Sequence, residues 1–344
     1  MNWAELKESV PKDGFAEKYE IYRRARPTVT LIVLRTVTDP ILFRSTDSER
    51  AETQEFNGVI HAQVNGEKFV SKERLTGLNL CRKLDEGENI ISGEYTYNEP
   101  VSLLKSQNAD MLTYGLAGTV SGKTFSQKSH VIEGYTYSLE PYDLMNKELH
   151  NAPYESGTML SDKIVRGRRK QSESLFNPVK VQPGTHFVHF VTLEAGTKEM
   201  LLYLLYNIFN TGRYGARETR TGRNMKNEVV GLITSAGDSS LSCGEMISDY
   251  ITESESELSR GMISSKISNY INEHKRADWN LYYANDFELD GGSEFPKWLK
   301  DLISIGSCKE GNGSAVIKSA LETIHKQGLK ANSELNEAVR KNID

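Results

Sequence analysis

One loop concentrates side chains that could bind phosphate. Residues 211–226 read TGRYGARETRTGRNMK, with four arginines and one lysine spaced by three glycines. A guanidinium can donate two parallel hydrogen bonds to a phosphate, glycine lets backbone amides approach an anion, and an exposed tyrosine can stack on a base. The loop therefore predicts binding of a nucleic acid or another phosphate ligand through Arg213, Tyr214, Arg217, Arg220, Arg223 and Lys226.

A second basic loop, at 165–170, reads VRGRRK. Arg166, Arg168 and Arg169 either contact phosphate or form a solvated surface loop, and the sequence leaves both interpretations open. Charge is unevenly distributed along the chain: 161–170 and 212–227 each carry a net charge of +4, whereas 236–260 carries −5. This asymmetry predicts a directional surface and head-to-tail contacts between copies of the chain.

A glycine-rich stretch approximates the phosphate-binding loop of nucleotide hydrolases, because residues 117–124 read AGTVSGKT. That loop joins a buried strand to a helix, but the residues before this stretch make a poor strand and those after it a poor helix. A nucleotide hydrolase is therefore a remote alternative. We expect instead a flexible glycine loop whose Lys123 and Lys128 contact phosphate.

A small group of acids supports a different hypothesis, in which the chain is an enzyme. Asp47, Glu49 and Glu52 lie close together and could hold Mg²⁺ for phosphodiester cleavage, although such acids are more often surface residues. The alternative function is thus a metal-dependent nuclease subunit that cuts a bound target strand, with Asp47 as the catalytic candidate. The seven histidines and three cysteines show no zinc-binding spacing, so we expect no other metal and no cofactor.

The overall composition is that of an ordinary soluble protein. The 42 lysines and arginines against 47 acids give a net charge of −5, which excludes a uniformly basic coat but allows local basic patches. The longest apolar run, Met200–Tyr206, is too short to cross a bilayer, so we expect no membrane partner. The three cysteines lie far apart, which favours the reducing cytoplasm.

Hydrophobic patterns outline an α+β fold. A nearly continuous apolar run predicts a buried strand at Thr28–Thr36, and an apolar body between Thr197 and Gly212 predicts a helix at Lys198–Thr211. With the remaining elements the order becomes β-α-β-β-α-β, which is the ferredoxin-like (RRM-like) arrangement. These remaining elements are a helix within Phe69–Leu84 and strands at His130–Ser138, Thr185–Leu193 and Asn227–Thr234.

Long insertions interrupt this predicted core. The core occupies 28–235 after an N-terminal segment at 1–27, with a thumb or lid at about 44–66. A glycine-rich insertion at about 98–128 and a basic insertion at about 143–182 follow. Residues 236–344 form a mainly helical C-terminal region, with helical spacing at Met246–Tyr270, Pro296–Ile305 and Ser314–Lys341.

Three stretches in this order resemble the repeated backbone subunit of CRISPR effector complexes, most closely its subtype I-D version. They are YTYSLEPY at 135–142, PGTHFVHFVT at 183–192 and LLYLLYNIFNTGRYGARETRTGRNMKN at 201–227. The resemblance spans about 28–235. It implies an RRM-like core with thumb or lid insertions that polymerises head-to-tail along CRISPR guide RNA. It also implies that the subunit holds the RNA backbone without regard to sequence, presents the guide for pairing with target nucleic acid, and assembles with other effector subunits.

Carried onto this chain, the resemblance places the thumb in 44–66 and the RNA groove at Arg213, Tyr214, Arg217, Arg220 and Arg223, with the loop 118–128 facing the RNA. It implies no catalysis by the chain itself. Some relatives in type III complexes cut target RNA with a thumb-loop aspartate, and Asp47 matches that residue only by position. The zinc ligands that some relatives carry are absent, and so are the base-stacking aromatic residues of true RRMs in Thr185–Leu193.

Overall fold

The structure is a computed structural model that describes residues 2–20, 23, 25–43, 51–85, 108–120, 123–142, 146–148, 160–165, 168–171, 179–216, 222–251, 258–308 and 313–341. The helices are α1 (Trp3–Ser9), α2 (Glu67–Asp85), α3 (Ala109–Tyr114), α5 (Lys198–Asn210), α6 (Cys243–Tyr250), α7 (Arg260–His274), α8 (Lys297–Gly306) and α9 (Gly313–Lys341). The strands are β1 (Thr28–Val37), β2 (Glu52–Phe56), β3 (Val59–Val64), β4 (Leu116–Val120), β5 (Lys123–Gln127), β6 (Val131–Glu133), β7 (Thr136–Pro141), β8 (Asn146–Glu148), β9 (Leu160–Val165), β10 (Arg168–Gln171), β11 (Val179–Val181), β12 (His186–Glu194), β13 (Met225–Ser235), β14 (Asn280–Tyr283) and β15 (Ser293–Glu294).

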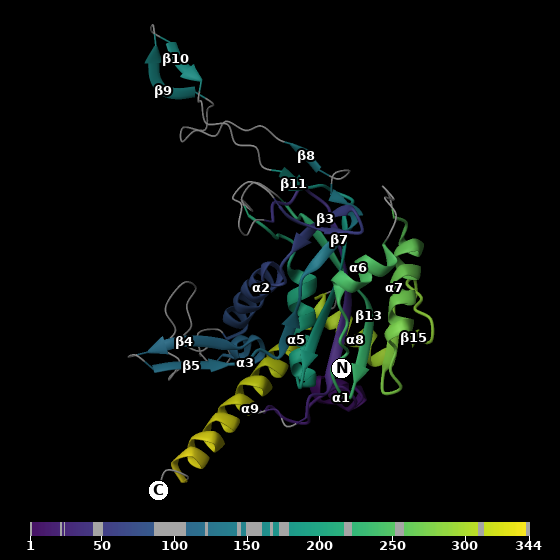
Figure 1. Ribbon diagram of the computed structural model, residues 1–344. Coiled ribbons are helices and arrows are strands. Elements are labelled where there is room, and N and C mark those ends of the chain that lie inside the picture. Colours follow the sequence, from purple (N-terminus) through teal and green to yellow (C-terminus); the bar gives the residue numbers. More distant parts are fainter. Residues whose placement is uncertain are drawn as a thin grey trace.

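One large sheet organises the molecule (Figure 1). Among the described residues it has nine strands in the order β15-β14-β13-β1-β12-β7-β3-β2, with β6 also paired to β12. The central strand β1 pairs antiparallel with both β12 and β13. Three two-stranded hairpins or ribbons, β4–β5, β8–β11 and β9–β10, lie outside this sheet. The fold is therefore α+β, as the sequence predicted.

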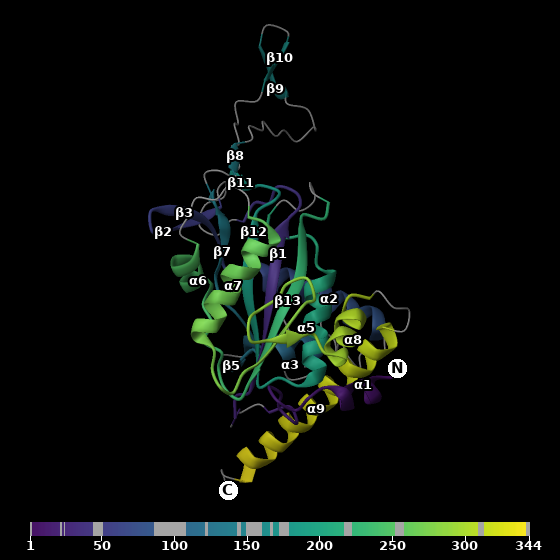
Figure 2. The ribbon, with the colours of Figure 1, turned by 90° about the vertical axis from the view of Figure 1, so that its right-hand side faces the viewer.

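The two faces of β1 are buried in two different cores, because successive side chains of a strand point to opposite faces. Val29, Leu31 and Val33 pack in the core formed with α1, α2, α5, α8 and α9. Ile32 and Leu34 pack in the core formed with α6 and α7. Figure 2 shows these two helical layers on either side of the sheet. Burial of both faces explains why β1 reads as a continuous apolar run rather than an alternating one.

Most predicted elements are present with shifts of a few residues, and the exceptions have physical causes. The predicted strand at His130–Ser138 is two strands, β6 and β7, separated at Gly134. The residues 109–114, which were expected to be irregular, form α3, with Asn108 accepting a hydrogen bond from the backbone of Met111 at 2.7 Å. The long helical stretch at 246–270 is divided between α6 and α7.

The first and last helices pack in the same hydrophobic core as the central strand β1 and helix α5. Trp3, Leu6 and Val10 at the N-terminus pack in the core that also contains Leu321 and Ile324 of α9. The region after Ser235 is mainly helical, but its strand β14 extends the large sheet by pairing with β13. Within the described residues, no helix is both long and apolar enough to span a bilayer.

Candidate nucleic-acid interface

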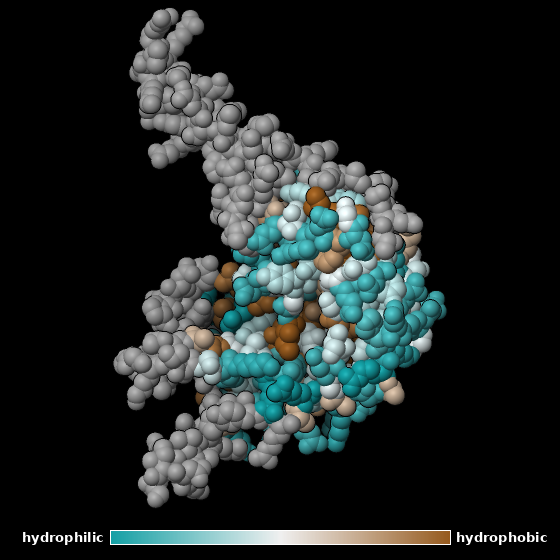
Figure 3. Space-filling model, viewed as in Figure 1, coloured by the Kyte–Doolittle hydropathy of each residue, from teal (hydrophilic) through white to brown (hydrophobic). Residues whose placement is uncertain are grey.

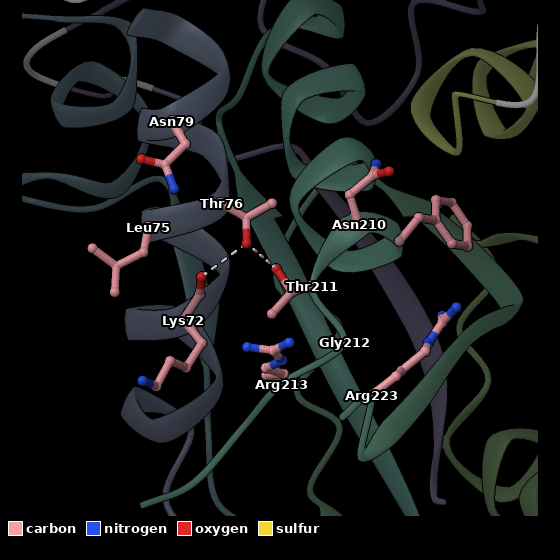
Figure 4. Close-up of a pocket in the computed structure, with 10 residues that line it drawn as sticks. Lys72, Leu75, Thr76, Asn79, Asn210, Thr211, Gly212, Arg213 and Arg223 are labelled. Carbon is pink, nitrogen blue, oxygen red and sulfur yellow. Dashed lines mark hydrogen bonds between the residues drawn. The ribbon is translucent and has the colours of Figure 1, made fainter. Parts of the chain in front are cut away.

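An open groove of about 540 Å³ lies between α2 and the segment that follows α5 (Figure 4). Its lining is rich in cations, amides and hydroxyl groups, which are the groups that bind phosphate and sugar. The lining residues are Lys72, Leu75, Thr76, Asn79, Phe209, Asn210, Thr211, Gly212, Arg213 and Arg223. Two of the six residues predicted in the loop 211–226 therefore line this groove, together with a helix that the sequence did not connect to it.

The helical period of α2 separates its groove residues from its core residues. Lys72, Thr76 and Asn79 recur three or four positions apart and line the groove, whereas Glu73 and Gly77 between them are buried. Gly77 allows α2 to approach α5 closely, because a side chain there would collide with the Tyr203 hydroxyl. The hydroxyl of Thr211 also donates a hydrogen bond to that of Thr76 at 2.7 Å, which closes the base of the groove.

Arg213 and Arg223 are the exposed cations of the groove. No acid in the described part of the chain forms an ion pair with either guanidinium. The backbone around them is fixed, because Asn224 donates from its backbone N–H to Gly212 O at 2.8 Å and Thr38 donates to Arg223 O at 3.0 Å. A Cβ atom at Gly212 would lie only 2.9 Å from Cγ of Arg223. The Arg223 side chain can therefore pack directly over the backbone of Gly212 because glycine has no side chain. Two charged side chains on a fixed backbone are suited to binding a polyanion.

The prediction that Tyr214 stacks on a base is wrong. Its side chain is fully buried, and its hydroxyl donates a hydrogen bond to Oε1 of Glu73 at 2.9 Å. Burial raises the pKa of Tyr214 well above its usual value. The two backbone groups of Tyr214 are held by the side-chain amide of Asn224, each at 2.9 Å. The sequence showed an aromatic residue among arginines, but it did not show that this residue points into the core while its neighbours point outward.

A buried ion pair lies beneath Tyr214. Arg35 continues the face of β1 that carries Val33, and its Nη1 donates to Oε1 of Glu73 at 2.6 Å. Burial alone would lower the pKa of Arg35, but the charge of Glu73 and smaller contributions from Tyr214 and Glu133 raise it above its usual value. The Arg35 guanidinium therefore stays charged although its side chain is fully buried.

The pKa values of two further ionisable groups next to this pair are shifted toward the neutral forms. Burial, followed by the charge of Glu73, raises the pKa of Glu133 well above its usual value, which favours the protonated carboxyl. Burial, followed by the charge of Arg35, lowers the pKa of His189 well below its usual value. Within the cluster of Arg35, Glu73, Glu133 and His189, the direct contact between Arg35 and Glu73 limits the cost of burying it.

The basic loop 211–226 and the ends of two predicted insertions meet close to this cluster. Gly215 has a φ of +79°, and a side chain there would lie 2.7 Å from the carbonyl of Leu42. The next residue, Ala216, donates from its backbone to that carbonyl at 2.9 Å. Ile41 pairs in the same way with Val181, where the long basic insertion returns to the core. The start of the predicted thumb, the basic loop 211–226 and the insertion 143–182 therefore meet at one end of β1.

The glycine-rich loop lies at the opposite end of β1. Lys128 forms an ion pair with Glu194 at 3.0 Å, and Glu194 pairs with Thr28 at the start of β1. Arg23 binds the same carboxylate at 2.7 Å. Since β1 has ten residues that each advance about 3.3 Å, Lys128 lies about 30 Å from the basic loop. Lys128 and Arg213 are therefore not brought together in one copy of the chain.

The phosphate-loop alternative for 117–124 is contradicted by the same region. Leu116–Val120 and Lys123–Gln127 are antiparallel strands β4 and β5, with Val120 opposite Lys123. A strand therefore follows the lysine, where a nucleotide-binding loop requires the N-terminus of a helix. The sequence pattern matched by glycine spacing alone.

The remaining predicted residues divide into three groups. Lys226 is exposed on β13 and pairs with Glu228 at 3.0 Å. Lys123 begins β5, and Arg168 and Arg169 begin β10. The structure describes the backbone of these three residues but not their side chains. Arg166, Arg217, Arg220 and the catalytic candidate Asp47 lie outside the described residues. Within the described ranges, no three histidines, cysteines or acids are arranged to hold a metal ion.

Several residues of the site were missed by sequence reasoning. Lys72 and Asn79 gave no signal beyond their place in a predicted helix, and Arg35 was hidden in an apolar run. The signal that was available is the charged residue inside an otherwise apolar, buried strand. Such an arginine requires a buried acidic partner, which here is Glu73.

Comparisons with known proteins agree with this fold. A model of the family described as Csc2 Crispr matches residues 14–311. The chain is similar to the crystal structure of Thermofilum pendens Csc2, with 13% identity, a TM-score of 0.50, and coverage of 93% of this chain and 94% of that one. It is also similar to a chain of a CRISPR RNA-guided surveillance complex, pre-nicking, with 9% identity, a TM-score of 0.52, and coverage of 82% of this chain and 100% of that one.

No curated protein sequence matches the chain. The family model nevertheless spans far more than half of it, and the two solved structures share its fold. The chain therefore belongs to the Csc2 CRISPR family, the backbone subunits of type I-D CRISPR effector complexes.

Proposed function

We propose that this backbone subunit holds the guide RNA by its phosphates in the groove between α2 and the basic loop 211–226. The observation that carries the proposal is the pair of exposed arginines, Arg213 and Arg223, that line the groove opposite Lys72 and have no acidic partner among the described residues. Phosphate contacts fix the position of a strand but carry no base information. Binding in this groove is therefore independent of sequence.

The lining of the groove supports a polar ligand. Figure 3 shows one face of the molecule, which is largely hydrophilic and has an apolar area near its middle. The exposed amide of Asn79 adds a donor beside the cations, whereas Nδ2 of Asn210 donates to Tyr206 O and to Gly306 O, each at 2.8 Å. An uncharged donor such as that of Asn79 suits sugar hydroxyls and phosphate oxygens alike.

We also propose that the core is ferredoxin-like. The strands β13, β1, β12 and β7 lie side by side in that order and pair antiparallel, and α2 and α5 pack on the same face of β1. This is the order expected for a split βαβ core, with the fourth, first, third and second core strands in line.

Head-to-tail assembly along the RNA, pairing of target nucleic acid with the guide, and a cytoplasmic location are further parts of this proposal. The opposite net charges of 212–227 and 236–260 support the first of them.

A salt titration of RNA affinity tests the groove. Fluorescence anisotropy with labelled single-stranded RNA would compare the parent with Lys72→Ala and Arg213→Ala, and Lys83→Ala would serve as the matched control. Lys83 is an exposed lysine of the same helix that does not line the groove. Each groove variant should make the slope of log affinity against log salt shallower by about 0.7. The reason is that one fewer phosphate is neutralised, so fewer counterions are released when the RNA binds. Unchanged slopes in both groove variants would overturn the proposal.

A further inference from the structure

We propose that the hydrogen bond from Tyr214 to Glu73 sets the width of the RNA groove, so that Tyr214 and Glu73 are positioning residues for RNA binding. This inference depends on the function proposed above. It assigns a role to two buried side chains that do not line the groove.

The argument begins with the order of residues on the two walls. Lys72 and Glu73 are consecutive on α2, and Arg213 and Tyr214 are consecutive in the basic loop. In each pair the first residue lines the groove and the second is buried. The two buried members contact each other directly, with 2.9 Å between the Tyr214 hydroxyl and Oε1 of Glu73. A change in this distance moves the backbone that carries Lys72 relative to the backbone that carries Arg213.

The hydrogen bond is itself held from two sides. Nη1 of Arg35 donates to the same Oε1 of Glu73 at 2.6 Å, and Nδ2 of Asn227 donates to the Tyr214 hydroxyl at 2.8 Å. The guanidinium of Arg35 also lies 4.2 Å from the centre of the Phe69 ring. Glu73 is therefore tied to the central strand, and Tyr214 is tied to β13. The two walls of the groove, α2 and the basic loop, are each held in position by a hydrogen bond to a strand of the large sheet.

The chemistry of the contact favours a geometric role over a purely stabilising one. A buried ion pair is often no more stabilising than apolar residues of the same volume, whereas its hydrogen bonds are directional. Apolar packing at this position would tolerate sliding of α2 against the loop. A charge-assisted hydrogen bond of fixed length does not, and a clamp for regularly spaced phosphates needs a fixed distance between its cations.

The test is a double-mutant cycle between the hydrogen bond and the groove. Tyr214→Phe removes only the hydroxyl and keeps the ring in the core. It should weaken RNA binding about 10-fold, which corresponds to loss of one hydrogen bond to a charged group. In a Lys72→Ala background the same change should have almost no effect, because the distance between Lys72 and Arg213 no longer matters. Tyr270→Phe is the matched control, since this buried tyrosine donates from its hydroxyl to Oε2 of Glu245 at 2.8 Å and packs in the core on the other face of the sheet.

A second variant separates positioning from stability. Glu73→Gln removes the charge that pairs with Arg35 but keeps an oxygen that can accept from Tyr214. It should lower the midpoint of urea unfolding more than Tyr214→Phe does, yet keep RNA affinity within about twofold of the parent. A merely structural role predicts the reverse, with affinity falling in the same order as stability.

The outcomes are distinct. Additive effects of Tyr214→Phe and Lys72→Ala, or an affinity loss in Tyr270→Phe equal to that in Tyr214→Phe, would overturn the positioning role while leaving the groove intact. If Lys72→Ala and Arg213→Ala bind RNA as the parent does, the groove itself is wrong, and the positioning role falls with it. Non-additivity together with near-parent affinity of Glu73→Gln would establish the positioning role.

Discussion

The two ends of β1 carry basic loops of similar appearance in the sequence and opposite character in the structure. At one end, Arg213 and Arg223 face an open groove, and no acid of the described residues pairs with them. At the other end, Lys128 and Arg23 share the carboxylate of Glu194, at 3.0 and 2.7 Å. The difference is one acid at the edge of the core. A cluster of cations in a sequence shows where charge is present, but its partners decide whether that charge is available to a ligand.

The two ends also differ in what holds them. The basic loop is fixed by a buried tyrosine above an ion pair, so its base belongs to the core. The end of the glycine-rich loop is held by Arg23, which donates to the carbonyls of Lys128 and Ser129 at 2.9 and 2.8 Å, whereas 63% of the Lys128 side chain is exposed. Removing Tyr214 should therefore affect folding and binding together, whereas removing the exposed Lys128 side chain should affect little.

The largest effect should follow from removing the anchor of the basic loop. Tyr214→Ala empties a fully buried aromatic site and should lower the free energy of unfolding by about 3–5 kcal/mol. Urea unfolding followed by circular dichroism measures this. A base-stacking Tyr214 at the surface would instead leave stability unchanged, so an unaltered midpoint would contradict the buried position.

The free energy of unfolding should depend on pH through His130, which lies beside Glu194 at the other end of β1. Burial, followed by the charge of Arg23, lowers the pKa of His130 to about 4 from its usual value near 6.5. Between these values the unfolded chain binds a proton that the folded chain does not, so stability is highest above pH 6.5 and falls as the pH drops towards 4. The loss attributable to His130 should reach about 3 kcal/mol.

His130→Asn isolates that contribution. Its amide can still donate to the carbonyl of Glu194, which Nδ1 of His130 approaches at 2.9 Å. Urea unfolding at several pH values between 6.5 and 4 should show a flatter dependence in the variant than in the parent. Identical curves would mean that His130 is protonated as readily in the folded chain as in the unfolded one.

The next effect concerns binding at the open end. Replacing Arg213 and Arg223 together by alanine should weaken RNA binding by about 2 kcal/mol and make the salt slope shallower by about 1.4. The fold should persist, because both side chains are exposed. Anisotropy titrations with a homopolymer and a mixed-sequence RNA should give the same loss. A loss confined to one sequence would show base recognition and refute a phosphate-only role.

The smallest effect is expected for Lys128→Ala. Its pair with Glu194 is exposed on the lysine side, so the change should cost less than about 1 kcal/mol of stability. The RNA salt slope should stay within error of the parent, because the charge is already matched by a carboxylate. A slope as shallow as that of the double arginine variant would show that both ends bind the same strand, and the contrast between them would disappear.

Sequence reasoning succeeded where burial imposes a local pattern. The strand β1 and the helix α5 consist almost entirely of apolar residues, and both could be predicted from that pattern. It failed where the answer depends on contacts between distant residues. Tyr214 and Glu73 are 141 positions apart, and no local property of TGRYGA indicates which of its side chains turns inward. The same limit hid Lys72, whose place on the groove depends on how α2 packs against α5.

The two edge strands of the large sheet affect whether copies of the chain can associate by backbone pairing. Strand β2 forms one margin, where three of its five side chains are exposed and two of its residues are glutamates, and the other margin is β15, which is only two residues long. Charged side chains and short length are the two simplest ways to stop an open strand from recruiting another chain by backbone pairing. If copies of the chain gather along one RNA as proposed above, these edge strands keep them from associating through backbone pairing in its absence. Side-chain surfaces, rather than exposed backbone, are then the means by which one copy recognises the next.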